Sequence, residues 1–148
     1  MKIDLNTCKI ESTTNRGNAK EASACAYFGI ERTKHDSTSY DTHSDIELPD
    51  LFMSVKSESF TLMSGGKCKG CKTFEGIWRR FRKNVHSDWF MYVTNEYTAY
   101  IMDIDKFSKF VHKFTYLDRE SKKNGGGLKI KSRTESKAML AWLEENCA

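Results

Sequence analysis

Two spacings of hydrophobic residues alternate along this chain, and their alternation constrains the fold more than any other feature. Between residues 73 and 86, apolar side chains recur every three or four positions, as on the buried face of an amphipathic helix. The segments 89–94 and 96–102 follow; they are rich in aromatic and aliphatic residues and predict two strands joined near Asn95. Helical and extended segments therefore follow one another, which predicts an α/β fold with helices packed on a sheet.

Further elements are predicted on both sides of this region. They are an alanine-rich helix, two strands around Pro49-Asp50, a helix capped by Asp103, a short strand and a last helix capped by Thr134, at residues 15–28, 40–48, 51–62, 103–114, 128–132 and 134–145. The 148 residues suffice for one domain. We therefore expect a single domain over residues 1–148, with a central mixed β-sheet flanked by helices and with residues 1–13 as a mobile or edge segment.

The composition excludes two classes of protein. Hydrophobic residues make up 39% of the chain and aromatic residues 12%, which is enough for a core and excludes wholesale disorder. No apolar run exceeds six residues, whereas a membrane-spanning helix needs about 20, so we expect no membrane segment. An odd number of cysteines and an N-terminal stretch without an apolar export segment indicate a reducing, cytoplasmic compartment.

Positive charge is concentrated in one short part of the chain. The net charge is only +4, but residues 67–83 hold seven cations against one carboxylate. A concentrated basic patch indicates a polyanionic partner, for which nucleic acid is the first candidate. A solvated helix face is the alternative. The cations expected to hold phosphate are Lys67, Lys69, Lys72, Arg79, Arg80, Arg82 and Lys83.

Cys68 and Cys71 lie in the same basic part, with the two-residue spacing of half a zinc site. A structural zinc site needs four ligands, and no second pair at such a spacing follows. Two ordinary thiols on a loop are therefore the simpler interpretation, and a zinc-stabilised interaction domain is the competing one.

Polar residues share one face of the predicted hairpin. If its strands pair about the central proline, Asp45 lies opposite Ser54 and Lys56 lies opposite His43, and Glu47 projects from the same face. The wet side of an ordinary amphipathic hairpin would look the same. The other face is expected to be core and carries Ile46, Leu48, Met53 and Val55.

Carboxylates beside a lysine suit the hydrolysis of a phosphodiester bond. That reaction needs an activated water, relief of the charge on the phosphate and a stabilised leaving oxygen. Hard divalent cations held by carboxylates supply all three. A neighbouring lysine can orient or deprotonate the water, or neutralise the transition state.

At these residues the sequence resembles the PD-(D/E)XK nuclease superfamily, which has the restriction-endonuclease-like fold. Asp45 matches the aspartate of that motif and Lys56 its lysine, and Asn15–Glu21 is similar to the glycine-then-glutamate opening of the first helix. The resemblance covers residues 15–94 in pattern, and its motif is short and degenerate. Ser54 departs from the family, which has an acidic residue at that position.

The resemblance implies an endonuclease that depends on Mg²⁺ or Mn²⁺ and acts on nucleic acid, with DNA favoured, in restriction or in a phage or mobile element. Asp45 would bind the metal, and Lys56 would act on the attacking water with Ser54 beside it. The carboxylate that completes the metal site stays open between Glu75, Glu47 and Glu21.

Two further questions stay open in the sequence. If none of these carboxylates reaches the metal, the chain would be a non-catalytic nucleic-acid-binding module on the same fold. A homodimer is expected for an enzyme that cuts both strands symmetrically, and a monomer for one that nicks DNA or processes its ends.

Overall fold

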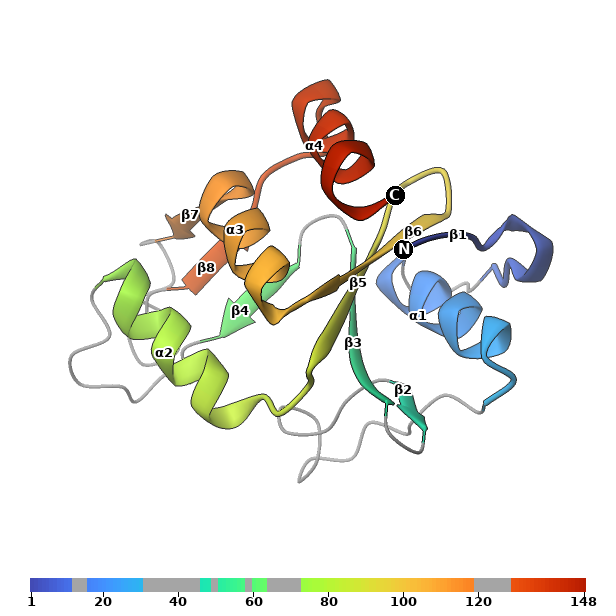
Figure 1. The fold of residues 1–148 in the computed structure, drawn as a ribbon, viewed down its shortest axis with the longest axis horizontal. Helices are drawn as coiled ribbons and strands as arrows, with labels where there is room; N and C mark the ends of the chain where they lie inside the picture. Colours follow the sequence, from blue (N-terminus) through green and yellow to red (C-terminus); the bar gives the residue numbers. More distant parts are fainter. Residues whose placement is uncertain (12–15, 31–45, 49–50, 58–59, 64–72, 119–128) are drawn as a thin grey trace.

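The computed structural model describes residues 1–11, 16–30, 46–48, 51–57, 60–63, 73–118 and 129–148 (Figure 1). Among the helices in these ranges, none is long and apolar enough to cross a membrane. The helices are α1 (Arg16–Tyr27), α2 (Phe74–Asn84), α3 (Ile104–Phe114), α4 (Lys137–Cys147) and a short 3₁₀ helix, η1 (Asn6–Cys8).

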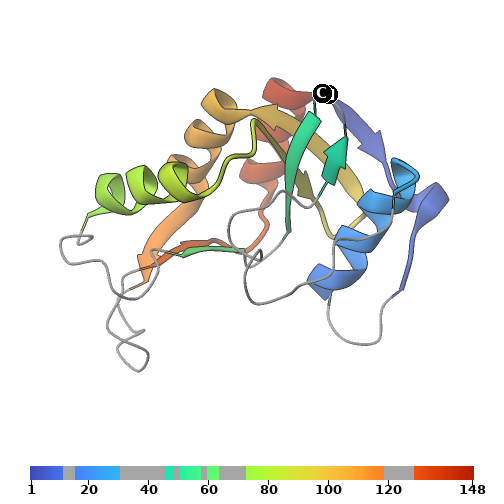
Figure 2. The same ribbon diagram turned by 90° about the horizontal axis from the view of Figure 1, so that it is seen from below.

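Five strands form a central sheet, named sheet A, in the order β1-β6-β5-β3-β2. Neighbouring strands are antiparallel except β3 and β5, which are parallel and are connected through α2. Figure 2 shows α1 on one side of this sheet and α3 and α4 on the other, so the expected α/β fold with a central mixed sheet flanked by helices is confirmed. The strands are β1 (Lys2–Asp4), β2 (Ile46–Leu48), β3 (Leu51–Ser57), β5 (Trp89–Val93) and β6 (Thr98–Asp103).

A second, smaller sheet, named sheet B, was not predicted. It contains β4 (Thr61–Met63), β8 (Lys129–Ser132) and β7 (Thr115–Asp118) in that order, and both pairs are antiparallel. One face of sheet B packs under α2 and α3 (Figures 1 and 2). The chain therefore encloses a core between two sheets and a layer of helices.

The strand predicted over residues 51–62 is interrupted, which corrects the expectation from the sequence. β3 ends at Ser57, the backbone N–H of Phe60 donates to the carbonyl of Ser57 at 3.1 Å, and β4 begins at Thr61 in the other sheet. Phe60, directly before β4, is buried in the core. In the sequence, the alternating apolar positions change from odd (Leu51, Met53, Val55) to even (Phe60, Leu62) after the polar run 56–59. This change of phase is the local sign of the interruption, and the prediction of one continuous strand overlooked it.

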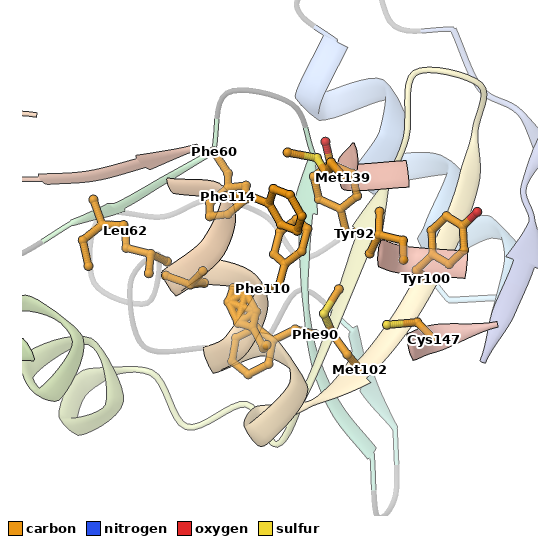
Figure 3. Packing of buried hydrophobic residues seen from close by; sticks show 14 of the residues in the cluster. Phe60, Leu62, Phe90, Tyr92, Tyr100, Met102, Phe110, Phe114, Met139 and Cys147 are labelled. Carbon is orange, nitrogen blue, oxygen red and sulfur yellow. The ribbon is translucent and has the colours of Figure 1, made fainter. Parts of the chain in front are cut away.

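Buried residues form two clusters, one on each face of sheet A, and the larger one, between sheet A, sheet B and the helices α2, α3 and α4, is strongly aromatic (Figure 3). Phe107 of α3 lies flat against Phe90 of β5, with 4.0 Å between ring centroids and 7° between ring planes. Phe110 packs between Phe60 and Tyr92, with centroid distances of 6.3 and 5.2 Å. Burying a side chain of this size contributes about 1.5–3 kcal/mol, so these rings are a major reason why α3 lies across both sheets.

Polar side chains define where α3 and α4 begin. Asp103 accepts a hydrogen bond from the backbone N–H of Lys106 at 2.9 Å, which confirms its predicted role as a cap. The last helix differs from the prediction: Ser136, rather than Thr134, accepts from the N–H of Met139, and α4 begins at Lys137. Both residues can cap a helix, so the sequence alone does not distinguish between them.

Candidate functional site

The hairpin expected to carry the site is present where the structure describes it. Ile46 pairs with Met53 and Leu48 with Leu51, which is the register assumed in the sequence analysis. Ile46 and Met53 are buried in the core under α1, as expected. Asp45 lies outside the described residues, and so does the side chain of Glu47.

β3 brings the two other predicted residues beside β5. In the parallel register, Ser54 lies next to Phe90 and Lys56 next to Tyr92, so both project from the sheet face opposite α1. Parallel strands end at the same edge of a sheet, and ligands of open α/β sheets bind outside those carboxyl ends. Lys56, one residue before the end of β3, is therefore at a position suited to a functional group.

Ser54 has a packing role at this position. It is only 4% exposed, and its hydroxyl lies 2.7 Å from the hydroxyl of Ser87 in the connection between α2 and β5. The guanidinium of Arg82 donates to the Ser87 carbonyl at 3.1 Å. These bonds join β3 to the end of α2. Ser54, which was predicted to lie beside the catalytic lysine, therefore takes part in packing.

A polar cluster lies at the carboxyl ends of β3 and β5, and we name it the edge cluster: Lys20, Tyr92, Asn95 and Glu135. Lys20 of α1 is only 3% exposed, and its ammonium donates to the side-chain carbonyl of Asn95 at 2.9 Å. The Glu135 carboxylate accepts from the hydroxyl of Tyr92 at 3.2 Å and from the backbone N–H of Asn95 at 3.3 Å. A nearly buried ammonium needs such partners, because its desolvation is costly.

Sequence reasoning missed the edge cluster. Its members come from α1, from β5, from the turn after β5 and from the segment before α4. Lys20 stands within the alanine-rich stretch of the first helix, and a lysine there gives no sign of burial. Only the fold brings these four positions together.

The structure separates two of the candidate metal-binding carboxylates. Glu21 belongs to α1, which packs on β3, and it is partly buried. Glu75 lies in the first turn of α2, where its carboxylate is 3.0 Å from Nε2 of His112 on α3. In Figures 1 and 2 that end of α2 lies beyond sheet B, away from β3. Glu21 thus lies on the α1 side of β3, opposite to the face from which Ser54 and Lys56 project, and neither of these two carboxylates is placed beside Lys56.

A Mg²⁺ site at β3 would use oxygen donors, which hard cations prefer. Among the residues with described side chains, no three His, Cys, Asp or Glu residues are grouped so that they could hold a metal ion. The expected donors Asp45 and Glu47 are not part of that set. Asp45 and Glu47 therefore enter only as proposals.

The basic face of α2 is smaller than its sequence suggests. Arg79 and Lys83 are exposed, whereas Arg80 is half-buried and its Nε is buried without a hydrogen-bond partner in the described part of the chain. The guanidinium of Arg82 donates hydrogen bonds to the backbone carbonyls of Val85 and Ser87. The remaining residues of the predicted patch and the cysteine pair lie outside the described ranges: Lys67, Lys69, Lys72, Cys68 and Cys71.

Comparison of the chain with protein families, with curated proteins and with solved structures finds no match. Function is therefore inferred from the residues and from their placement in the fold.

Proposed function

We propose that this protein is a metal-dependent endonuclease that hydrolyses phosphodiester bonds of DNA at the carboxyl end of β3. The observation that carries the proposal is the parallel pairing of β3 with β5, which puts Lys56 at a shared carboxyl edge. In the register of the β2–β3 hairpin, Asp45, directly before β2, would lie opposite Ser54.

Lys56 is assigned to the attacking water and the phosphate. Its ammonium would neutralise charge that develops on the phosphate, or would orient the water for in-line attack. Asp45 and Glu47, which share the face of Lys56 in this register, would hold Mg²⁺, and Mn²⁺ could replace it. The bound cation would polarise the phosphate and lower the pKa of a water ligand.

The exposed cations of α2 are assigned to the DNA backbone. Arg79 and Lys83 stand one helical turn apart and are exposed, so both can reach phosphates. Such contacts give affinity without sequence information, and they weaken as salt rises. Lys67, Lys69 and Lys72 are proposed to extend this backbone contact.

The test is cleavage of supercoiled plasmid with Mg²⁺, with Mn²⁺ or with EDTA. We expect metal-dependent nicking or linearisation by the wild type. Asp45→Ala and Lys56→Ala should each lower the rate by about 100-fold or more, since removing a group that acts on the transition state typically costs that much. Circular dichroism should show that both variants keep the wild-type fold.

Lys109→Ala is the matched control, because Lys109 is an exposed lysine on α3 with no place in the site. It should cleave at the wild-type rate. Cleavage by Lys56→Ala at that same rate would remove Lys56 from the mechanism, and cleavage that persists in EDTA would contradict the metal dependence.

A non-catalytic nucleic-acid-binding module is the second candidate. It is favoured by the burial of Ser54, which occupies the acidic position of the family motif and is already bonded to Ser87. Gel-shift binding that depends on salt, is unaffected by Mg²⁺ and occurs without cleavage under any metal would support this candidate over the endonuclease.

A further inference from the structure

The two faces of sheet B differ sharply in character. Leu62 of β4 and Ile130 of β8 are 1% and 0% exposed, and they point into the aromatic core under the helices. Because side chains alternate along a strand, Lys129 and Lys131 of β8 point to the opposite face. We name this second face the outer face of sheet B.

Three cations follow one another along this outer face. Lys129 and Lys131 are half-buried, and Arg133, directly after β8, is exposed. Positions two residues apart on a strand are separated by about 6.6 Å, so the three charges form a regular row. Such a row is complementary to an extended chain of phosphates.

The outer face also presents an aromatic ring within this row. Tyr116 of β7 lies directly opposite Lys131 and is 38% exposed. The guanidinium of Arg133 lies over its ring, 5.6 Å from the centroid. The ring is therefore held beside two cations, with part of its surface in solvent.

The positive charge of the outer face is poorly balanced by its neighbours. Asp118 stands opposite Lys129 in the register and is the acidic residue on the same face of β7. No ion pair links Lys129, Lys131 or Arg133 to a carboxylate within the described part of the chain. Among the described residues of this face, three cations stand against one carboxylate, so this part of the face is electropositive.

We propose that the outer face of sheet B binds single-stranded nucleic acid, with the backbone along the row of cations and a base stacked on Tyr116. A row of cations alone would bind any polyanion. The exposed ring of Tyr116 favours single-stranded nucleic acid over a duplex. A single strand exposes the faces of its bases for stacking on an aromatic side chain, whereas a duplex hides them. The inference rests on the proposed function in one respect, namely that the ligand is a nucleic acid.

The position of the outer face suits a strand that also reaches the candidate site. β4 follows β3 in the chain, with Thr61 only five positions after Lys56, and Thr61 pairs with Lys131. Figure 2 shows sheet B almost edge-on, with α2 and α3 above it and with the end of β3 leading toward β4 on the lower side. A single strand on the outer face would therefore run toward Lys56.

The test measures binding without divalent metal, so that no cleavage occurs. Fluorescence anisotropy would follow a labelled oligothymidine of about 20 nucleotides and a duplex of the same length, both in EDTA. Loss of one stacked base should make Tyr116→Ala bind the oligothymidine about tenfold more weakly, with less than about a twofold change for the duplex. Tyr116→Phe keeps the ring and should bind the oligothymidine like the wild type. Lys131→Ala should reduce the slope of log affinity against log salt by about 0.7.

Matched controls come from surfaces other than the outer face of sheet B. Tyr27 of α1 is 47% exposed, and Tyr27→Ala should leave oligothymidine binding unchanged, as should Lys109→Ala. If Tyr116→Ala binds the oligothymidine like these controls, or if the wild type binds only the duplex, the outer face is not a single-strand site and the nuclease proposal is untouched. If the wild type binds neither nucleic acid, the ligand class of the proposed function fails and this inference fails with it.

Discussion

Ser54 shows how a single residue in a motif can serve packing instead of chemistry. Its hydroxyl is bonded to that of Ser87, in a connection whose carbonyl is held by Arg82. From the sequence, Ser54 was predicted to lie beside the catalytic lysine, and Arg82 was predicted to belong to a basic helix face. In the structure, both of them fix the end of α2 against the central sheet.

The first prediction at this scale concerns the stability contributed by Ser54. Ser54→Ala removes one buried hydrogen bond and should lower the free energy of unfolding by about 1 kcal/mol. Ser54→Asp puts a carboxylate at a position that is only 4% exposed and should lower it further, because desolvating a charge costs more than losing a hydroxyl. Urea denaturation monitored by tryptophan fluorescence measures both changes.

Ser57→Ala is the control for this prediction. Ser57 lies on the same strand but is half-buried, so its replacement should change the free energy of unfolding by less than about 0.5 kcal/mol. A Ser54→Asp variant as stable as the wild type would contradict the packing role. If such a variant also cleaved DNA faster, Ser54 would instead be a degenerate position of a metal site.

At the scale of elements, the sequence predicts helices better than sheets. The aromatic stripe and the cap fix α3, because both signals lie within a few neighbouring residues. β7, at Thr115–Asp118, follows α3 directly and was not predicted. It is a strand because it pairs with β8, and that partner is distant in the sequence. Strand pairing is a non-local property that local patterns do not encode.

The candidate site, like the strands, was predictable only where a local sequence pattern determines it. The hairpin face of Ser54 and Lys56 follows from alternation, and the structure places both residues on one face of β3. The parallel partner β5 and the edge cluster do not follow from any local pattern. Glu75 illustrates this limit of local patterns. The helix that carries it was predicted correctly, but its side chain lies beside His112 on α3 and not beside β3.

The cap of α3 provides the prediction for this scale. Asp103 ends β6 and begins α3, so Asp103→Ala removes the partner of the Lys106 N–H. The free energy of unfolding should fall by about 1 kcal/mol, whereas Asp103→Asn, which can still cap, should lose only a few tenths. Urea denaturation would measure the three proteins side by side.

Asp105→Ala separates the hydrogen bond of the cap from the general effect of charge near the start of a helix. Asp105 is exposed in the first turn of α3, so its loss should affect only the interaction with the helix dipole and cost less than the loss of Asp103. Equal losses for the two alanine variants would show that charge, and not capping, stabilises this end.

At the scale of the whole molecule, the two ends of the chain are joined. β1 forms an edge of sheet A beside β6, and the ammonium of Lys2 lies 2.7 Å from the carboxylate of Glu144 on α4. The same carboxylate accepts a hydrogen bond from the Tyr100 hydroxyl. Figures 1 and 2 both show the termini close together. The first strand and the last helix are thus coupled through one carboxylate.

This junction perturbs two titrations in opposite directions. Hydrogen bonds from Lys2 and then from Tyr100 lower the pKa of the Glu144 carboxyl below its usual value of 4.5. Burial, and then the hydrogen bond to Glu144, raise the pKa of the Tyr100 phenol well above its usual value of 10.0. The junction therefore favours a charged Glu144 and a neutral Tyr100 across the range between these values.

The pH dependence of stability follows from the direction of the Glu144 shift. A carboxyl with a lowered pKa in the folded state contributes stability above its unfolded pKa, and this contribution is lost as the pH falls through the folded value. Glu144→Gln should therefore lower the melting temperature at about pH 7. The difference from the wild type should shrink below about pH 4.5, as Glu144 becomes protonated in the wild type. Thermal melts followed by circular dichroism over this range measure it.

Glu145→Gln is the matched control, since Glu145 is the exposed neighbour of Glu144 on α4 and has no part in the junction. Its melting temperature should follow that of the wild type at every pH. A Glu144→Gln deficit that stays constant down to about pH 3 would mean that the carboxylate charge is not what joins α4 to β1 and β6.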